Sequence, residues 1–415
     1  MQNFEINSDQ IDKIKKITAE EKSFRIKNLE LFKATGFPNK RLEDWKFSDF
    51  ENIVSRNFEE LNIKKASSEI NKIDLLKDFD HNHILLVNGN FHSSNFEHEE
   101  KSKIKISSCD KSIDYKISKN PLICLNHALA ENGYSLEIDK NYKLNKVLVV
   151  YNIFTKDMKN KILNNKNKIK VNENAELHVI EYTVNESKSK FINNVYENIS
   201  LERNSKLKNI SVQCNESDGF FHKFLKNKLS LNSDYSNLIF SSGLKFNKLD
   251  IECDLLEESC KCNILSALFL KKNEHQEIKT LINHLAPNCI SNQKIKNVLS
   301  SESKGVYQGK IYVKDVAQKT NAYQLSKALL IDDNAEFNAK PELEIYADDV
   351  KCSHGSSSGN IDEESLHYLM TRGLNRNDSI KLLIKGFLND VIEFIKNPKI
   401  KKFIESKLEK QINGR

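Results

Sequence analysis

The chain has 415 residues, of which 39% are hydrophobic and 29% are charged, and its formal net charge is +6. This composition is that of a globular protein with a large core, and it excludes a disordered chain. Lys and Glu intermix along the whole sequence and Arg is scarce, so we expect no nucleic-acid partner.

We expect neither a membrane-spanning stretch nor an export signal. No segment approaches the ~20 apolar residues of a span, and the opening residues MQNFEINSDQ lack the apolar core of a signal peptide. We therefore expect a cytoplasmic protein without membrane contact. Its eight cysteines then face reducing conditions, so we expect no disulfides, and the absence of a CxxC pair argues against a closed zinc or cluster site.

Residues 1–80 are predicted to form a mostly helical region. Apolar residues recur near the helical period over roughly the first 35 positions, until Gly36 and Pro38 end the pattern. The only tryptophan, Trp45, follows in the segment NKRLEDWKFSDF. We expect its large side chain to anchor this region on the body of the protein, and we expect the polar residues 50–80 to be irregular with short helices.

The next part of the chain changes to a period of two, which predicts β-strands. A strand over Ile84–Val87 ends at the turn signal Asn88-Gly89, and a short helix is predicted over Cys124–Ala130. Further strands are predicted at Val147–Phe154, Leu177–Val184, Asn194–Leu201, Lys206–Gln213, Leu238–Phe240, Leu249–Cys253, Ala267–Leu270, Ile278–Leu281, Gly309–Val313 and Ala328–Ile331.

A weak repeat runs through these strands. Each unit joins a strand end, a corner with Asn or Asp, a small residue and another apolar residue. The corners fall at Asn174, Asn204, Asp234 and Asn334, and the first three are 30 residues apart. Asn and Asp tolerate the left-handed backbone of such corners, and short strands repeating every 20–50 residues are typical of a solenoid. We therefore predict a β-helix core over residues 81–358, with a β-sandwich as the alternative.

Residues 359–415 are predicted to be helical again. One helix spans Asp362–Met370 and ends at Gly373, and the next is capped by Asp378 or Ser379. Pro398 separates this second helix from a last one. The apolar stripe of the second helix either docks on the body of the protein or forms a face for a partner. It consists of Ile380, Leu383, Ile384, Phe387, Leu388, Val391, Ile392 and Ile395.

The segment from residue 340 to 373, KPELEIYADDVKCSHGSSSGNIDEESLHYLMTRG, carries the strongest chemical signal. Glu344–His354 is predicted as one strand, followed by a glycine-serine turn. Because alternate residues of a strand share a face, Cys352 and His354 should point to the same side, with Asp348 further back. A thiolate beside an imidazole can hold a soft transition metal or carry a transferring sulfur. The alternative is that both side chains simply pack in the core.

Several motifs resemble the SufB/SufD family, subunits of the SUF iron–sulfur cluster assembly complex. KPELEIYADDVKCSHG and GNIDEESLHYLMTRGL are similar to the C-terminal signature of the family, and HQEIKTLINHLAPNCISNQ, GVYQGKIYV, AQKTNAYQ and KALLI follow the family in order and spacing. RLEDWKF, at residues 41–47, resembles the N-terminal motif of the SufD members in particular. The resemblance implies a right-handed parallel β-helix flanked by N- and C-terminal helical regions.

The resemblance also implies a function. It predicts a non-catalytic scaffold that pairs with a SufB-like subunit, contributes to iron loading and nascent cluster formation, and docks a SufC-like ATPase on its C-terminal helices. His354 matches the functional histidine of the family and Cys352 its neighbouring cysteine. These two residues would bind a transient iron or iron–sulfur cluster shared with the partner, although Cys352 could also only pack. No GxxxxGK[ST] loop occurs, so we expect no nucleotide on this chain.

Two other functions stay open at this stage. One is a β-helix enzyme that acts on polysaccharide, which the missing export signal disfavours; its one acidic pair, Asp348 and Asp349, would also face opposite sides of a strand. The other is a stand-alone module that binds a metal or presents a thiol without partners.

Overall fold

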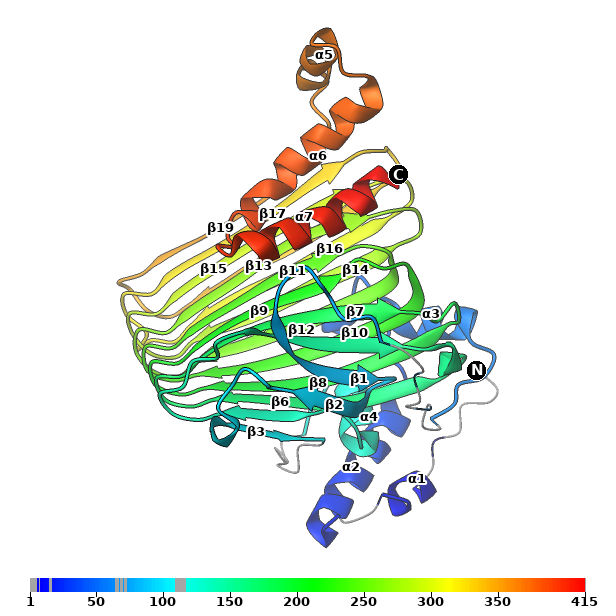
Figure 1. The fold of residues 1–415 in the computed structure, drawn as a ribbon, viewed down its shortest axis with the longest axis vertical. Helices are drawn as coiled ribbons and strands as arrows, with labels where there is room; N and C mark the ends of the chain where they lie inside the picture. Colours follow the sequence, from blue (N-terminus) through cyan, green and yellow to red (C-terminus); the bar gives the residue numbers. More distant parts are fainter. Residues whose placement is uncertain are drawn as a thin grey trace.

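The computed structural model describes residues 6, 8–14, 17–63, 67, 70, 73–108 and 117–414. Its centre is a stack of coils in which the chain alternates between two β-sheets (Figure 1). From β5 onward, each strand pairs in parallel with the strand two places along the chain. This pairing confirms the predicted parallel β-helix, and the alternative of a β-sandwich is wrong because its neighbouring strands would run antiparallel.

The first sheet has ten strands and the second has nine. Each predicted strand from Ile84–Val87 to Ala328–Ile331 falls on one of them, although several predictions cover only part of the strand; the strand predicted over Glu344–His354 does not. The first sheet contains β1 (His81–Val87), β2 (Asn90–Asn95), β5 (Val147–Phe154), β7 (Glu176–Asn185), β9 (Lys206–Gln213), β11 (Asp234–Ser241), β13 (Lys261–Leu270), β15 (Ile290–Leu299), β17 (Asn321–Leu330) and β19 (Lys351–Asn360). The second contains β3 (Ile104–Ser107), β4 (Ser135–Ile138), β6 (Ile162–Val171), β8 (Phe191–Leu201), β10 (Ser217–Leu229), β12 (Leu244–Leu255), β14 (His275–His284), β16 (Lys304–Val313) and β18 (Glu336–Ile345).

One corner of the coils is built from asparagines with left-handed backbone. Asn141, Asn174, Asn204 and Asn232 all have positive φ, between 54° and 59°. The side-chain amide nitrogens of Asn174, Asn204 and Asn232 each donate to the amide oxygen of the asparagine one coil below, at 2.8–2.9 Å. Asn174 and Asn204 are therefore corners, as predicted. Asn334 also lies at a corner, in the turn between β17 and β18, but its backbone is not left-handed. The prediction for Asp234 is wrong, because this residue already begins β11 and the corner residue is Asn232.

The residue after each corner is small because it lies at the tight bend, inside the coil. Ala175, Ser205, Ser233, Cys260 and Cys289 occupy this position in successive coils, and each is at most 1% exposed. The seven described cysteines are unbridged, and Cys109 lies outside the described residues. Cys260 and Cys289 thus fill space at the bends.

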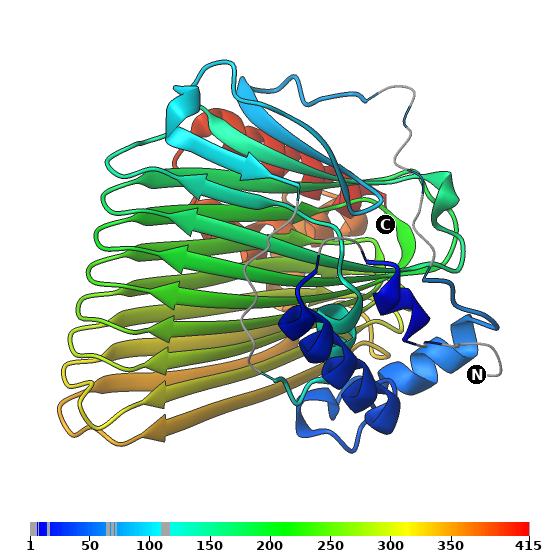
Figure 2. The ribbon, with the colours of Figure 1, turned by 90° about the horizontal axis from the view of Figure 1, so that it is seen from below.

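The N-terminal helices cover the outer face of the second sheet (Figure 2). The single helix predicted for the first ~35 residues is two helices, α1 (Asp9–Asp12) and α2 (Ala19–Thr35). Gly36 ends α2 with a φ of 69°. Helix α2 packs on α4 (Pro121–Leu129), which in turn contacts β6 and β8. Helix α3 (Phe50–Asn57) completes this layer.

Trp45 anchors the N-terminal region as predicted, and it is only 1% exposed. It lies in the short 3-10 helix η1 (Glu43–Trp45), and the ammonium of Lys248 stands 4.8 Å from its ring centre. Lys248 is fully buried and ion-paired with Glu277 and Asp250. Burial alone would lower the pKa of Lys248, but the two carboxylates raise it, so the residue stays charged.

The C-terminal helices are α5 (Glu363–Thr371), α6 (Arg376–Ile392) and α7 (Pro398–Asn413). Asn375 caps the N-terminus of α6, because its side chain accepts a hydrogen bond from the backbone amide of Asp378. The predicted cap at Asp378 or Ser379 is therefore wrong. The apolar stripe of α6 packs, together with α7, on the outer face of the first sheet (Figure 1). The stripe therefore docks on the protein itself. None of the described helices is long and apolar enough to cross a membrane.

Candidate functional site

The last coil leaves one end of the β-helix open. Among the described strands, β18 is the last of the second sheet and pairs only with β16, while β19 is the last of the first sheet and pairs only with β17. We call these two strands the open end. Eight of the ten residues of β19 are exposed, and only Cys352 and Gly355 are half-buried. An unpaired strand edge of this kind can accept a strand from another chain.

Cys352 and His354 lie on the same face of β19, as predicted. They align with Ala322 and Gln324 of β17, whose side chains are buried inside the coil. Cys352 and His354 therefore occupy inward-facing positions in a coil that has no next coil above it. His354 is exposed and Cys352 is half-buried, so both lie at the surface of this chain.

The rest of the prediction for this segment is wrong. Glu344–His354 is not one strand, because β18 ends at Ile345 and β19 begins at Lys351 in the other sheet. Asp348 lies in the corner between the two strands, not further back on the face that carries Cys352. The predicted glycine-serine turn after His354 is a continuous part of β19. The two acidic residues at 348 and 349 thus do not belong to a strand face either.

The backbone of the open end shows which groups are free to pair. The backbone amide of Lys351 donates to the carbonyl of Thr320. Because the pattern alternates along a strand, every second residue from Lys351 hydrogen-bonds to β17 through its N–H and C=O groups. Cys352, His354, Ser356 and Ser358 therefore point these groups away from the chain. On β18, the amide of Glu336 donates to Ser303, which leaves residue 341 among the outward-pointing positions. That residue is a proline, so one backbone donor is missing from the edge of β18.

Cys352 is held in an apolar setting. Its side chain packs against a small cluster that includes Val313, Ala322 and Leu343. Burial raises the pKa of the Cys352 thiol, and a bond from the backbone of Ala322 offsets this only in part. The thiol is therefore protonated at neutral pH, and a metal ion would have to displace its proton.

The open end supplies few metal ligands. Among the described residues, no group of three or more His, Cys, Asp or Glu side chains is arranged to hold a metal ion. Iron bound at His354 and Cys352 would thus need ligands from elsewhere. His284, Thr280 and Cys289, which fall in a motif that resembles the family, are all buried inside the coils.

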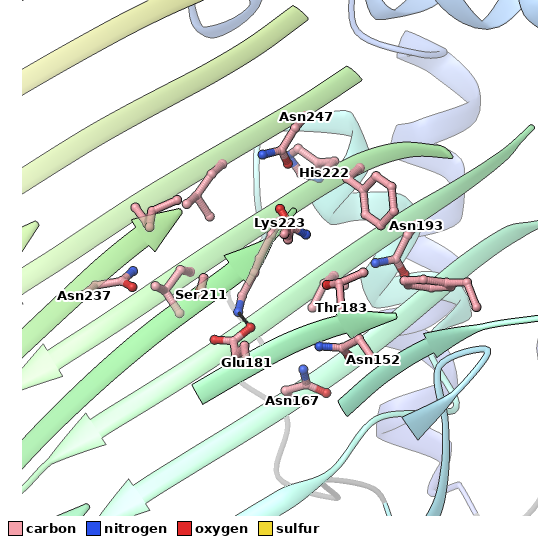
Figure 3. A pocket seen from close by; sticks show the side chains of 17 residues that line it. Asn152, Asn167, Glu181, Thr183, Asn193, Ser211, His222, Lys223, Asn237 and Asn247 are labelled. Carbon is pink, nitrogen blue, oxygen red and sulfur yellow. Dashed lines mark hydrogen bonds and ion pairs between the residues drawn. The ribbon is translucent and has the colours of Figure 1, made fainter. Parts of the chain in front are cut away.

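A second polar region, which sequence reasoning missed, lies between the two sheets. Lys223 reaches Glu181 at 2.7 Å and Glu197 at 3.0 Å beside a cavity of about 60 Å3 (Figure 3). Burial raises the pKa of Glu197, while the two carboxylates raise the pKa of Lys223. The cavity has room for a few water molecules. No local pattern marks Lys223 as inward-facing, because that depends on the register of β10.

A patch of exposed apolar residues lies on α5 and the first half of α6. Helix α5 projects beyond the last coil (Figure 1), and it forms a groove with α6 that Tyr368, Leu369, Leu382 and Leu383 line. The side chains of Tyr368 and Leu382 in this groove are 57% and 47% exposed. We call these two residues the α5–α6 patch. Exposed apolar residues that gather in one place are typical of an interaction surface.

Comparison with known proteins identifies the family. Residues 153–387 match the family described as SUF system FeS cluster assembly, SufBD core domain. Residues 2–150 match the SufBD protein N-terminal region. The core match covers more than half of the chain, so this chain belongs to the SufBD family of the SUF iron–sulfur cluster assembly system.

Within that family the chain is SufD-like. It is 26% identical over 397 residues to the iron–sulfur cluster assembly protein SufD of Escherichia coli, covering 93% of this chain and 92% of that one. It is 30% identical over 205 residues to a SufBD family protein of Synechocystis, covering 49% of this chain and 45% of the relative. It is 29% identical over 236 residues to the chloroplastic protein ABCI7 of Arabidopsis thaliana, covering 56% of this chain and 49% of the relative. The SufD relatives are named as assembly proteins, not as enzymes.

Proposed function

We propose that this chain is the SufD-like scaffold subunit of a SUF complex in the cytoplasm, and that its open end pairs with a SufB-like subunit. The observation that carries the proposal is the position of Cys352 and His354 on the free edge of β19. Two ligand-type side chains on an unpaired edge can share an iron atom with a second chain. They can also release it when the two chains move apart, which a closed cage of four cysteines would hinder.

Iron and the nascent cluster are cargo in this proposal, not a resident cofactor. His354 would bind iron through an imidazole nitrogen, and Cys352 would bind after losing its proton. The chain itself would be non-catalytic and would bind no nucleotide. A SufC-like ATPase would dock on the C-terminal helices, for which the α5–α6 patch offers exposed apolar area. Its ATP-driven motion would open the shared site.

Pairing at the open end can be tested by amide hydrogen exchange. In the isolated chain, the amides of Cys352, His354 and Ser356 should exchange fast, whereas those of Ser353 and Gly355 should be protected by β17. Adding a SufB-like partner should protect the first group as well. Failure to form a stable complex, or unchanged exchange along β19 within a complex, would contradict the proposed pairing.

The role of the site residues can be tested in the complex co-expressed with SufB-like and SufC-like partners. His354→Ala should leave the complex assembled but stop cluster maturation, while Ser356→Ala, at the next inward position of β19, should have no effect. Normal cluster yield from His354→Ala would remove this residue from the mechanism. Cys352→Val fills the same apolar pocket without a thiol, so a loss of maturation there would indicate sulfur or iron chemistry instead of packing.

Docking of the ATPase can be tested separately. Leu382→Glu places a charge in the α5–α6 patch, so it should weaken binding of the SufC-like subunit and leave pairing with the SufB-like subunit intact. Lys402→Glu, an exposed charge change on α7, is the control. Equal binding by both variants would place the ATPase elsewhere.

A further inference from the structure

A short column of polar side chains lies inside the last coils, directly below His354. On the first sheet, Gln293 of β15 aligns with Gln324 of β17, and Gln324 aligns with His354 of β19. Neighbouring parallel strands are ~4.8 Å apart, and aligned residues point to the same side. The three side chains therefore stand one above the other, and only the uppermost is exposed.

The lower part of this column is fixed by hydrogen bonds from the opposite sheet. The hydroxyls of Thr280 and Tyr307 both donate to the side-chain oxygen of Gln293, the second at 3.0 Å. All three residues are at most 1% exposed. Burial raises the pKa of Tyr307, so its hydroxyl stays protonated and remains a donor.

Gly309 makes room for the column. A Cβ atom at this position would lie 2.2 Å from the hydroxyl oxygen of Tyr307 and 2.7 Å from Oε1 of Gln324. Any other residue would therefore displace both polar atoms. The glycine lets the two side chains meet over its backbone, from opposite sheets.

The side-chain oxygen of Gln324 is an unpaired acceptor. The residue is 3% exposed, and its Oε1 atom has no hydrogen-bond partner among the residues that the structure describes. Leaving a buried acceptor unpaired costs about 1–3 kcal/mol. Within the same described residues, Nε2 of Gln293 also has no acceptor and could donate to Oε1 of Gln324. An amide oxygen has two lone pairs, so Oε1 can accept a second hydrogen bond as well. The other neighbour in register is the ring of His354.

The column is local and does not lead to the cavity at Lys223. Below Gln293 the aligned residue is Ile264, which is fully buried among apolar side chains. The polar groups near the open end therefore support His354 and do not form a path through the coil.

We propose that Gln324 is a positioning residue for His354. Turning the ring of His354 toward β17 lets one ring N–H donate to Oε1 of Gln324, which fixes the tautomer and leaves the other nitrogen free for a metal ion. Ligating histidines almost always donate their second N–H in this way, and losing that partner weakens metal binding by roughly 10–100-fold. The part of the proposal that concerns iron rests on the proposed function, whereas the hydrogen bond does not.

The hydrogen bond can be tested on the full isolated chain by NMR of 15N-labelled histidine, in alkaline buffer where histidine rings are neutral. His354→Ala identifies the signals. The wild type should show one tautomer of His354, and Gln324→Met, which is nearly isosteric, should show a mixture. Gln324→Glu restores an acceptor and should restore the single tautomer, while Ser326→Ala on the same strand is the control. A mixture in the wild type, or one unchanged tautomer in Gln324→Met, would overturn the proposal.

A second measurement separates this inference from the proposed function. Gln324→Met should weaken Fe2+ binding by the assembled complex roughly 10–100-fold, and Gln324→Glu should recover it. If the tautomer depends on Gln324 but Fe2+ binding does not depend on His354, the positioning stands and the proposed iron role fails. If Fe2+ binding depends on His354 but neither measurement responds to Gln324, the iron role stands and the positioning fails.

Discussion

The β-helix begins with two short antiparallel edge strands, β2 of six residues and β3 of four, whereas it ends with β18 and β19, which have ten residues each. The packing of the interior also differs between the two ends. At the first coils Phe96 and Ile104 close the core and are 8% and 9% exposed, whereas Ile345 at the last coil is 37% exposed. Short edges are a common protection against pairing with other chains. The difference teaches that short edge strands and apolar side chains close the first coil, whereas the last coil keeps two long, exposed strands.

The largest expected effect is a difference in stability between the two ends when a leucine is replaced by alanine. Leu136 of β4 is fully buried, so Leu136→Ala should lower the free energy of unfolding by about 2–5 kcal/mol. Leu343 of β18 is only half-buried, so Leu343→Ala should cost the isolated chain at most about 1 kcal/mol. Urea unfolding of both variants measures this. Equal losses would mean that the last coil is packed as tightly as the first.

A smaller effect concerns the loss of stability at acidic pH, to which the buried His127 contributes. His127 of α4 packs against Tyr196 over the first coils, and burial, helped by Lys166 and Arg25, lowers its pKa to about 3. The unfolded residue takes up a proton below about pH 6.5, whereas the folded one does not until about pH 3. Stability is thus lost as the pH falls between these values, by roughly 2 kcal/mol at pH 5.

The measurement compares unfolding free energies at pH 7.5 and pH 5. His127→Gln should lose about 2 kcal/mol less than the wild type on acidification, since the other buried histidines are present in both proteins. An identical pH dependence would mean that His127 is not shielded by the layer over the first coils.

The smallest effects concern two corner residues with left-handed backbone. Replacing each by glycine should change the free energy of unfolding in opposite directions. Asn204→Gly keeps the left-handed backbone but removes two side-chain hydrogen bonds, so it should cost about 1 kcal/mol. Nearer the open end, Lys319 has a φ of 58° without such a ladder. Lys319→Gly should therefore stabilise the chain by about 0.5–1 kcal/mol. Thermal unfolding measures the stability of both variants. If Lys319→Gly were destabilising, the side chain of Lys319 would contribute more to stability than its left-handed backbone costs.

Local pattern predicted the elements well where one face of a strand is buried by its own coil. The strand predicted over Val147–Phe154 matches β5, and the asparagines at 174 and 204 are true corners, because both features depend on near neighbours in the sequence. The same reasoning failed at residue 234. There the turn chemistry of Asn232 decides the corner, and a fixed spacing of 30 residues does not hold, since the distance to Asn204 is 28.

The candidate site was predicted only in part. The spacing of Cys352 and His354 suffices to place them on one face, since any strand alternates its side chains. The break between β18 and β19 was missed because apolar residues continue through Ile345 and Val350, across a corner that has no glycine or asparagine to mark it. The inward orientation of Gln324 and Tyr307 could not be predicted from the sequence, since isolated polar residues in a strand usually face water.

The sequence by itself thus determined the repeating strand and corner, the family, and the shared face of the thiol and the imidazole, since these depend on residues close along the chain. Only the tertiary structure decided which end stays open, which polar residues turn inward, and what stands beneath His354. The physical reason is register. The neighbours of a side chain in a stack of parallel strands come from about 30 residues away, and a shift of one position would exchange inside for outside.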